Sequence, residues 1–529
     1  MKTKYKRVRI LKIIVLSLLA IVLLLSIWQL IEYTKLKSVM LPEGAVYQVH
    51  TNMPPIAGEA IRLNRSYYLT RPSDEELRQW ENLIQIPGLD KEEDGALAEE
   101  AVSIRQQDVD QPDRLSIEQV EQELDFLQRY MKYGFALHAY MGGDDVFLPL
   151  FTDMREEMLN ASSGGYITTD TYIDILRRRV LWAVNDRHAY IGGQNHYQVF
   201  PESQYYSYTN DTIAFELQGG IYSCLLENQP CELLNIDGLA PEVYLKPGIL
   251  QDGSIAYIPW IYSDSETDIS VSCTLLMQDS TEQAFEKEII LTRVEPYDLA
   301  DDSIYSLVEE EDYFYLKNSS LMSISRNMDA LNQMVADAAK LGGNKPIIMD
   351  LRQHAGGNDY YAMFWILKYM NISRIQGLNI PLSAVSYDLE TRTVNSLWEG
   401  KLTSPVKSPG LVSRYKDGGG NPLHIKNDTP IFVLIDRGCG SSGEWFASYL
   451  SRLDNVVLIG ENTAGVSIGG NTCAVVLPYS RYRAVLSASI SINSDMRNLE
   501  GMGLYPDIYV PPTQAVDRVI AMIEKYEIG

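Results

Sequence analysis

The spacing of apolar residues changes twice along the chain, and each change predicts a different kind of structure. Between residues 117 and 189 they recur every three or four positions, the period of amphipathic helices. Residues 200–300 instead alternate and contain many Tyr, Thr and Val residues with Gly-containing turns, which predicts a β-rich domain. From residue 312 onward, short apolar runs such as residues 431–435 and 456–460 alternate with helical patterns. This alternation favours an α/β fold in which helices cover a sheet.

These patterns divide the chain into five segments. Residues 33–115 show little sustained periodicity and are predicted to be a juxtamembrane stalk or lead-in. The other four are a basic tail with a transmembrane anchor (1–32), a helical segment (116–200), a β-rich middle domain (201–311) and an α/β core (312–529).

The N-terminal pattern predicts where the protein is located. Lysines and arginines at positions 2–12 precede an apolar run at residues 13–31. A helix of this length spans roughly 28 Å, close to the thickness of the hydrocarbon core of a bilayer. The basic flank predicts a cytoplasmic N-terminus and an exported remainder. Because no small-x-small cleavage site follows, we expect an uncleaved single-pass anchor in the cell membrane, with the remainder of the chain extracytoplasmic.

Charge and cysteine content exclude several classes of function. The chain has 45 basic and 70 acidic residues, a net charge of −25, which argues against a nucleic-acid partner. Its five cysteines fit no metal-binding spacing, and the sequence predicts no metal and no cofactor. Cys224 and Cys231 are close enough to pair across a hairpin, although the sequence does not settle the pairing. Cys439 is a weaker rival nucleophile to the serine described next.

The strongest candidate for chemistry is Ser441. The buried strand at residues 431–435 runs through a Gly-containing turn into a helix that opens at Ser441. A hydroxyl at such a turn lies at the positive end of the helix dipole, where backbone N–H groups can face an oxyanion. The alternative is structural: Ser441 followed three residues later by Glu444 is also the pattern of a capping box.

Three further segments contain candidate partners for this serine. His188 follows a predicted helix and can act as a general base near neutral pH, or simply interact with the helix C-terminus. Gly356 and Gly357 follow a buried strand and allow close backbone approach, as an oxyanion donor or as an ordinary turn. Glu500 lies in a Gly-rich turn before a strand and is either functional or a solvated acid.

Taken together, the motifs resemble those of the tail-specific (C-terminal-processing) serine peptidases and their tricorn-core relatives. The resemblance covers residues 117–200 and 312–512 and implies an α/β, crotonase/ClpP-like layered core. The motifs occur in the family's order: Asp350-Leu-Arg-x-x-x-Gly356-Gly357, Gly440-Ser441-x-x-Glu444, Gly460-Glu461-x-Thr463-x-Gly465 and Glu500-Gly-x-Gly-x-x-Pro506-Asp507.

The sequence also chooses between two branches of this family. The tail-specific branch is expected to carry a lysine base directly after Gly465, but Val466 occupies that position and Lys525 is the only lysine after Ser441. The resemblance to the tricorn-like branch implies Ser441 as nucleophile, His188 as base and Glu500 as the group that orients the imidazole or stabilises its charge. It also implies oxyanion donors from the backbone of Ser442 and of Gly356 or Gly357.

Two residues depart from the family pattern. Arg187 replaces a small hydroxyl residue before the histidine, and a cation there is expected to lower the imidazole pKa. His354 replaces the asparagine usual in the glycine loop.

The sequence therefore predicts a membrane-anchored extracytoplasmic serine peptidase with a polypeptide substrate. The alternative is a catalytically silent relative that binds peptide or cell-wall material at the cell surface. Crotonase-type chemistry on acyl thioesters fits export poorly. The middle domain is weakly similar to a PDZ-like module and is expected to hold extended substrate by strand addition.

Overall fold

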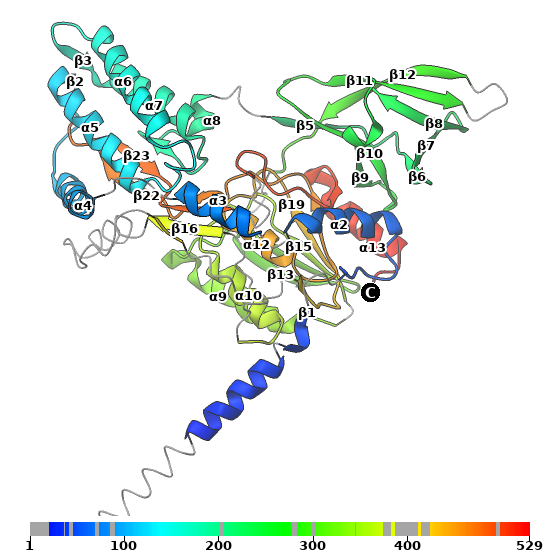
Figure 1. The fold of residues 1–529 in the computed structure, drawn as a ribbon. Coiled ribbons are helices and arrows are strands. Elements are labelled where there is room, and N and C mark those ends of the chain that lie inside the picture. Colours follow the sequence, from blue (N-terminus) through cyan, green and yellow to red (C-terminus); the bar gives the residue numbers. More distant parts are fainter. Residues whose placement is uncertain are drawn as a thin grey trace, which may run out of the picture.

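The computed structural model describes most of the chain and shows how its segments are arranged (Figure 1). The described residues are 21–35, 37–41, 46–68, 73–84, 90–200, 205–277, 283–298, 303–343, 345–373, 382–386, 411–413, 424–492 and 498–529.

A mixed sheet, fourteen-stranded among these residues, runs through the molecule. Four strands from β14 to β20 are parallel and form its core half, with β13 antiparallel at the edge and β25 parallel on the other side. Their bounds are β13 Tyr305–Glu309, β14 Phe314–Asn318, β15 Ile347–Asp350, β19 Ile431–Ile435, β20 Val456–Gly460 and β25 Ile508–Tyr509. The predicted α/β core is therefore confirmed as a mixed α/β fold with a large sheet.

Helices cover both faces of this half of the sheet, because alternate residues of a strand point to opposite faces. Ile431 and Val433 of β19 pack with three helices on one face, α9 Met328–Asp337, α10 Tyr360–Tyr369 and α12 Ser442–Leu450. Phe432 and Leu434 pack with two helices on the other face, α2 Pro55–Tyr68 and α13 Ala515–Lys525. The strands are thus buried on both sides, which explains their continuous apolar sequences.

The strands of the middle segment continue the same sheet. Strand β9 pairs with β25 of the core in parallel, at Tyr509 and Gly248, and with β10 in an antiparallel ladder. The remaining strands extend the sheet with a core of their own and lie apart from the helices in Figure 1. The bounds are β5 Tyr206–Thr209, β6 Glu216–Gln218, β7 Ile221–Leu226, β8 Gln229–Ile236, β9 Leu245–Ile249, β10 Ile255–Ser263, β11 Ile269–Met277 and β12 Ala284–Arg293.

A helical lobe is built around residues 91–199 and lies on the opposite side of the molecule (Figure 1). Its helices are α4 Lys91–Gln106, α5 Ile117–Gly134, α6 Asp144–Ala161, α7 Thr169–Val184 and α8 His196–Val199. They share one apolar core with a late part of the chain, which includes Ile468, Val475 and Leu486. The lobe therefore brings the end of α7 close to the C-terminal third of the sequence.

Several short strands join the lobe and the core. Strand β4 Tyr190–Ile191 pairs with β23 Arg483–Leu486, which pairs with β22 Cys473–Val476. Outside these sheets lie α3 Asp74–Ile84, β1 Met40–Leu41, β2 Arg114–Ser116, β3 Tyr166–Thr168, β16 Leu382–Ser386, β17 Leu411–Ser413, β18 His424–Ile425, β21 Gly469–Gly470 and β24 Ser489–Ile492.

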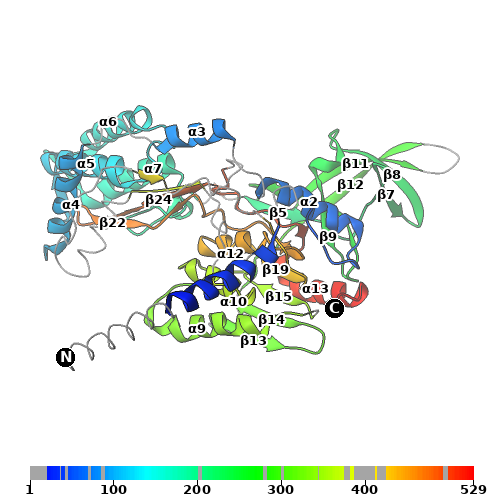
Figure 2. The ribbon, with the colours of Figure 1, turned by 60° about the horizontal axis from the view of Figure 1, so that its bottom comes forward.

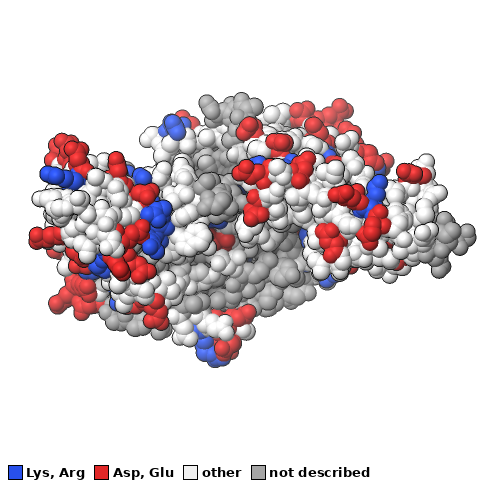
Figure 3. Space-filling model, turned by 90° about the horizontal axis from the view of Figure 1, so that it is seen from above, with Lys and Arg blue, Asp and Glu red and all other residues white. Residues whose placement is uncertain are grey.

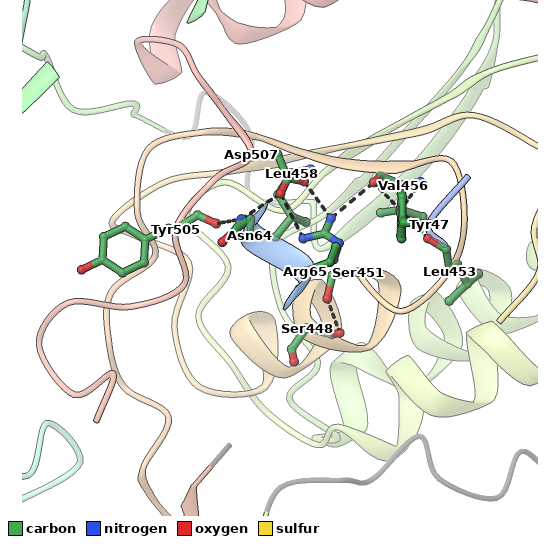
Figure 4. A network of polar contacts seen from close by, with 10 residues as sticks. All are labelled: Tyr47, Asn64, Arg65, Ser448, Ser451, Leu453, Val456, Leu458, Tyr505 and Asp507. Atoms are coloured by element: carbon green, nitrogen blue, oxygen red, sulfur yellow. Dashed lines mark hydrogen bonds and ion pairs between the residues drawn. The ribbon is translucent and has the colours of Figure 1, made fainter. Parts of the chain in front are cut away.

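Part of the segment predicted as a stalk or lead-in packs against the α/β core. Arg65 of α2 is buried and binds both carboxylate oxygens of Asp507, at 2.7 and 3.1 Å. Asp507 also accepts the backbone N–H of Leu458 in β20 at 2.8 Å and the Asn64 side chain at 2.7 Å (Figure 4). The Pro506-Asp507 motif thus has a structural role at this position, because it anchors α2 to the sheet.

The apolar N-terminal run lies partly outside the described residues. Residues 21–35 are helical, carry exposed apolar side chains, and project from the body of the molecule in Figure 1. In Figure 2, where the bottom of Figure 1 comes forward, the same helix lies in front of the core helices. Among the described residues, no helix has both the length and the apolar character needed to cross a membrane.

Candidate active site

Ser441 lies at a sharp turn between β19 and α12. Its backbone has a φ of 53° and a ψ of −121°, a conformation that non-glycine residues rarely adopt. The buried carboxylate of Glu444, one turn into the helix, accepts the Ser441 backbone N–H at 3.0 Å. Glu444 therefore caps the N-terminus of α12, as the capping-box pattern predicted. The Ser441 hydroxyl instead contacts His188.

Glu444 also fixes the loop that follows β20. Its carboxylate accepts the Thr463 hydroxyl at 2.6 Å and the backbone N–H groups of Gly465 and Val466 at 2.9 and 2.7 Å. These hydrogen bonds explain the Gly-Glu-x-Thr-x-Gly motif: the motif holds its own loop against the nucleophile turn.

The hydroxyl of Ser441 is paired with His188. The Nε2 atom of His188 lies 3.1 Å from the Ser441 Oγ, although 253 residues separate the two in sequence. Helix α7 ends at Val184, and the left-handed backbone of the C-cap Asn185 (φ 32°) turns the chain so that His188 can reach the core. The distance is within the range for proton transfer from a serine to a general base.

Asp186 places a carboxylate beside this histidine, and the sequence analysis assigned it no role. Its fully buried carboxylate accepts the backbone N–H of His188 at 2.9 Å and both the N–H and the hydroxyl of Ser487. Burial raises the pKa of this carboxyl, and a positive charge on His188 opposes that effect. Burial lowers the pKa of His188, and the charge of Asp186 opposes that effect. The available signal was a carboxylate two residues before the histidine, but its contact with Ser487 depends on tertiary structure.

Glu500 lies in the same cluster but contacts other groups. Its carboxylate oxygens accept the backbone N–H groups of Arg187 at 2.8 Å and Ile468 at 3.1 Å. Among the described residues, the His188 Nδ1 atom has no hydrogen-bond partner, so Glu500 does not orient the ring through a hydrogen bond. Burial, reinforced by the nearby charge of Asp186, raises the pKa of Glu500 to about 8. A protonated Glu500 cannot stabilise an imidazolium by charge. Asp186 is the other carboxylate beside His188 that could do so.

The glycine loop touches the nucleophile directly. A Cβ atom on Gly356 would lie 2.9 Å from the Cβ and 3.3 Å from the Oγ of Ser441, so a side chain at this position would push the loop away. The Gly356 N–H donates to the Nδ1 atom of His354 at 3.0 Å and is therefore already used. The backbone N–H groups of Gly357 and Ser442 remain as candidate oxyanion donors. The Ser442 hydroxyl donates to the Gly357 carbonyl at 2.7 Å and fixes these two residues relative to one another.

His354 is a buried support for this loop. Its Nδ1 accepts from Gly356 and its Nε2 lies 3.0 Å from the Asn318 Oδ1, so the hydrogen on Nε2 donates to Asn318. Burial lowers the pKa of His354 to about 4, which keeps the imidazole neutral. This departure from the family pattern therefore keeps both imidazole nitrogens of His354 hydrogen-bonded.

Two other expectations concern reactivity. The Cys439 thiol is buried, and burial raises its pKa well above the usual value, which disfavours the reactive thiolate. Arg187 was expected to lower the pKa of His188. The pKa is lowered, but burial is the main cause, and the Arg187 guanidinium instead stacks on the Tyr197 ring at 3.6 Å.

Residues 315–510 match the family model described as Peptidase family S41. The match includes Ser441 and is consistent with a serine peptidase in this part of the chain. No curated protein matches the chain.

Three solved structures are similar to it. Mature CPAF is 12% identical, with 78% of this chain and 96% of that chain covered and a TM-score of 0.38. The photosystem II D1 C-terminal processing protease is 13% identical, with 77% and 98% covered and a TM-score of 0.35. The tricorn protease is 14% identical, with 78% and 37% covered and a TM-score of 0.33.

Proposed function

We propose that the chain is a serine peptidase that cleaves polypeptides through an acyl-enzyme, with Ser441 as nucleophile and His188 as base. The observation that carries this proposal is the 3.1 Å distance between the His188 Nε2 and the Ser441 Oγ. A base at hydrogen-bond distance from a hydroxyl on a rigid turn is the minimum arrangement for nucleophilic catalysis.

The reaction begins with attack of the Ser441 oxygen on the peptide carbonyl carbon while His188 takes the hydroxyl proton. The negative charge that forms on the carbonyl oxygen is stabilised by the N–H groups of Gly357 and Ser442. His188 then donates the proton to the leaving amine, and water hydrolyses the acyl-enzyme by the same steps. The carboxylate of Asp186 stabilises the positive imidazolium that forms in each step.

The proposal extends to location and substrate binding. The basic and apolar pattern of residues 2–31 supports a single-pass anchor with an extracytoplasmic catalytic domain. We further propose that extended polypeptide is held by strand addition in the strand-rich part of the molecule.

A second candidate function is a catalytically silent relative that binds peptide or cell-wall material at the cell surface. It is favoured by one observation, the absence of a hydrogen-bond partner for the His188 Nδ1 among the described residues. Such a partner normally fixes the tautomer of a catalytic histidine.

A fluorophosphonate probe distinguishes the two functions. The peptidase proposal expects covalent labelling of the wild-type protein, and loss of labelling in Ser441→Ala and His188→Ala. Ser448→Ala is the matched control for Ser441→Ala, because Ser448 is a buried serine of α12, the helix that follows Ser441. His138→Ala is the control for His188→Ala, because His138 is also a buried histidine. A folded wild-type protein that is not labelled, and that cleaves unfolded casein no faster than Ser441→Ala, would leave only the binding function.

A further inference from the structure

A cavity of about 170 Å³ is lined by Arg187, the residue before His188, and by residues of the loop that follows β20. Its walls include two arginines, Arg187 and Arg437, and three tyrosines, Tyr197, Tyr205 and Tyr262. The cavity therefore combines aromatic surfaces with positive charge, in a chain whose net charge is −25. Figure 3 shows acidic side chains spread over one face of the molecule, with basic side chains among them.

The cavity adjoins both members of the candidate pair. Arg187 directly precedes His188. Ala464 of the cavity wall donates its backbone N–H to the Cys439 carbonyl at 2.8 Å, and its Cβ lies 3.4 Å from the position that a Cβ on Gly440 would take. Gly440 directly precedes Ser441, so this wall of the cavity reaches the residue before the candidate nucleophile.

The Arg187 side chain has unused hydrogen-bond donors. Its guanidinium lies 3.6 Å from the centre of the Tyr197 ring, and its Nε and Nη1 atoms are buried without a partner among the described residues. Burial lowers the pKa of Arg187 to about 10, so the side chain stays charged at neutral pH. Buried N–H donors without an acceptor are costly, and a ligand that supplies an acceptor removes this cost.

Arg437 differs because its charge is compensated within the protein. Its Nε lies 2.6 Å from the Glu461 Oε1, which also accepts the Ser207 hydroxyl at 2.5 Å. The Glu500 carboxylate binds the Arg187 backbone N–H, and no ion pair with the guanidinium is present in the described part of the chain. Arg187 is thus the arginine of this cavity with donors and charge available to a ligand.

We propose that this cavity is a specificity pocket in which Arg187 binds a substrate carboxylate next to the scissile bond. The inference rests on the proposed peptidase function and names its substrate class: polypeptides with an acidic group at the cleavage site. A planar guanidinium binds a carboxylate through two parallel hydrogen bonds, and the tyrosine rings pack against the rest of the bound group. The carboxylate belongs either to an Asp or Glu side chain or to the C-terminus of the polypeptide.

Matched peptides test the pocket and separate the two carboxylate sources. One arm compares Glu with Gln at each position flanking the cleaved bond, and the other compares a free C-terminal acid with its amide. We expect wild-type kcat/KM to favour the acidic member of one arm by about tenfold or more, since unpaired buried polar groups reject the neutral analogue. Preference in the first arm identifies a side chain, and preference in the second identifies the C-terminus.

Variants assign that preference to Arg187. Arg187→Gln is expected to reduce the acidic-to-neutral ratio to within about twofold of unity, and Arg187→Lys, which keeps the charge but loses the planar fork, to give an intermediate ratio. Arg178→Gln is the matched control, because Arg178 lies on α7, the helix that precedes Arg187, and pairs with Glu157 and Asp174 on the surface. An unchanged ratio in both Arg187 variants overturns the proposal.

A binding measurement keeps failure of the pocket distinct from failure of the peptidase function. The same labelled peptides are titrated into Ser441→Ala and into Ser441→Ala/Arg187→Gln, and fluorescence anisotropy gives each Kd. A catalytically silent protein would show no probe labelling. It would still bind acidic peptides about tenfold more tightly than neutral peptides, through Arg187. Equal affinity of Ser441→Ala for acidic and neutral peptides would overturn the pocket even if the protein proves to be a peptidase.

Discussion

The Asp186 carboxylate accepts the backbone N–H of His188 at 2.9 Å. Its negative charge raises the pKa of this histidine and so opposes the effect of burial. Only the neutral imidazole can accept the Ser441 proton, so activity is expected to rise with pH as His188 loses its proton. Because the pKa of His188 is lowered overall, the acid limb of kcat/KM should lie below the ordinary value of 6.5.

Asp186→Asn is expected to move this limb to still lower pH and to reduce kcat by about tenfold. The substitution keeps an oxygen that can accept from His188 and Ser487, but it removes the charge that stabilises the imidazolium, and 1.4 kcal/mol corresponds to a factor of ten. The pH profiles of kcat/KM and kcat measure both effects. Asp174→Asn, an exposed aspartate of α7, is the control. A profile of Asp186→Asn that coincides with wild type would contradict this role.

The pKa of Glu500 is raised from 4.5 to about 8 in the folded protein, and this shift predicts that stability depends on pH. Between these values the unfolded chain ionises this group while the folded protein keeps it protonated. Its contribution to stability is therefore fully present below pH 4.5 and is lost as the pH rises toward 8, by up to about 1.4 kcal/mol per pH unit.

Glu500→Gln removes this contribution, since glutamine does not titrate. The free energy of unfolding of the variant, relative to wild type, is expected to increase between pH 5 and pH 8. Denaturant unfolding at several pH values measures the difference, and Glu156→Gln on the surface of α6 is the control. A constant difference across this range would show that Glu500 is ionised in the folded protein.

The sequence predicted those parts of the molecule that depend on local pattern. The strand before Ser441 and the helix after it are encoded by a continuous apolar run and a helical repeat, and both are present as β19 and α12. The carboxylate of Asp186, two residues before His188, was a local sequence signal for a charged partner of this histidine. By contrast, the hydrogen bonds that direct Glu500 to Arg187 and Ile468 depend on how the helical lobe packs against the C-terminal third of the chain, and no local pattern encodes that packing.

Long-range pairing accounts for the other differences. The strands of the middle segment join the core sheet where β9 pairs with β25, and Gly248 is paired with Tyr509 at this point. A Cβ on Gly248 would lie 3.1 Å from the Tyr509 carbonyl oxygen, so the glycine permits a close approach that its own surroundings in sequence do not reveal. Helix α2 has few sequence features of a core element, yet Arg65 anchors it to Asp507, 442 residues away.

The hydrogen-bond chain from Asn318 through His354 to Gly356 predicts a stability defect that also reaches the nucleophile. His354→Leu would leave the Gly356 N–H and the Asn318 oxygen without partners, at a cost of about 1–3 kcal/mol. Labelling by the fluorophosphonate probe should slow, because Gly356 contacts Ser441. Asn318→Leu should be less than additive with His354→Leu in denaturant unfolding, since both remove the same interaction. Full additivity would mean that the two side chains act independently.

The buried ion pair between Arg65 and Asp507 predicts an asymmetric mutational response. Removing one partner leaves an uncompensated buried charge, so Arg65→Met or Asp507→Leu alone should cost about 3–5 kcal/mol in free energy of unfolding. The double variant should be more stable than Asp507→Leu, because no charge remains buried, although the backbone N–H of Leu458 still loses its acceptor. Arg62→Met, an exposed arginine of the same helix, is the control and should change stability by less than about 0.5 kcal/mol. If both single variants are as stable as wild type, α2 does not depend on this ion pair for its attachment to the sheet.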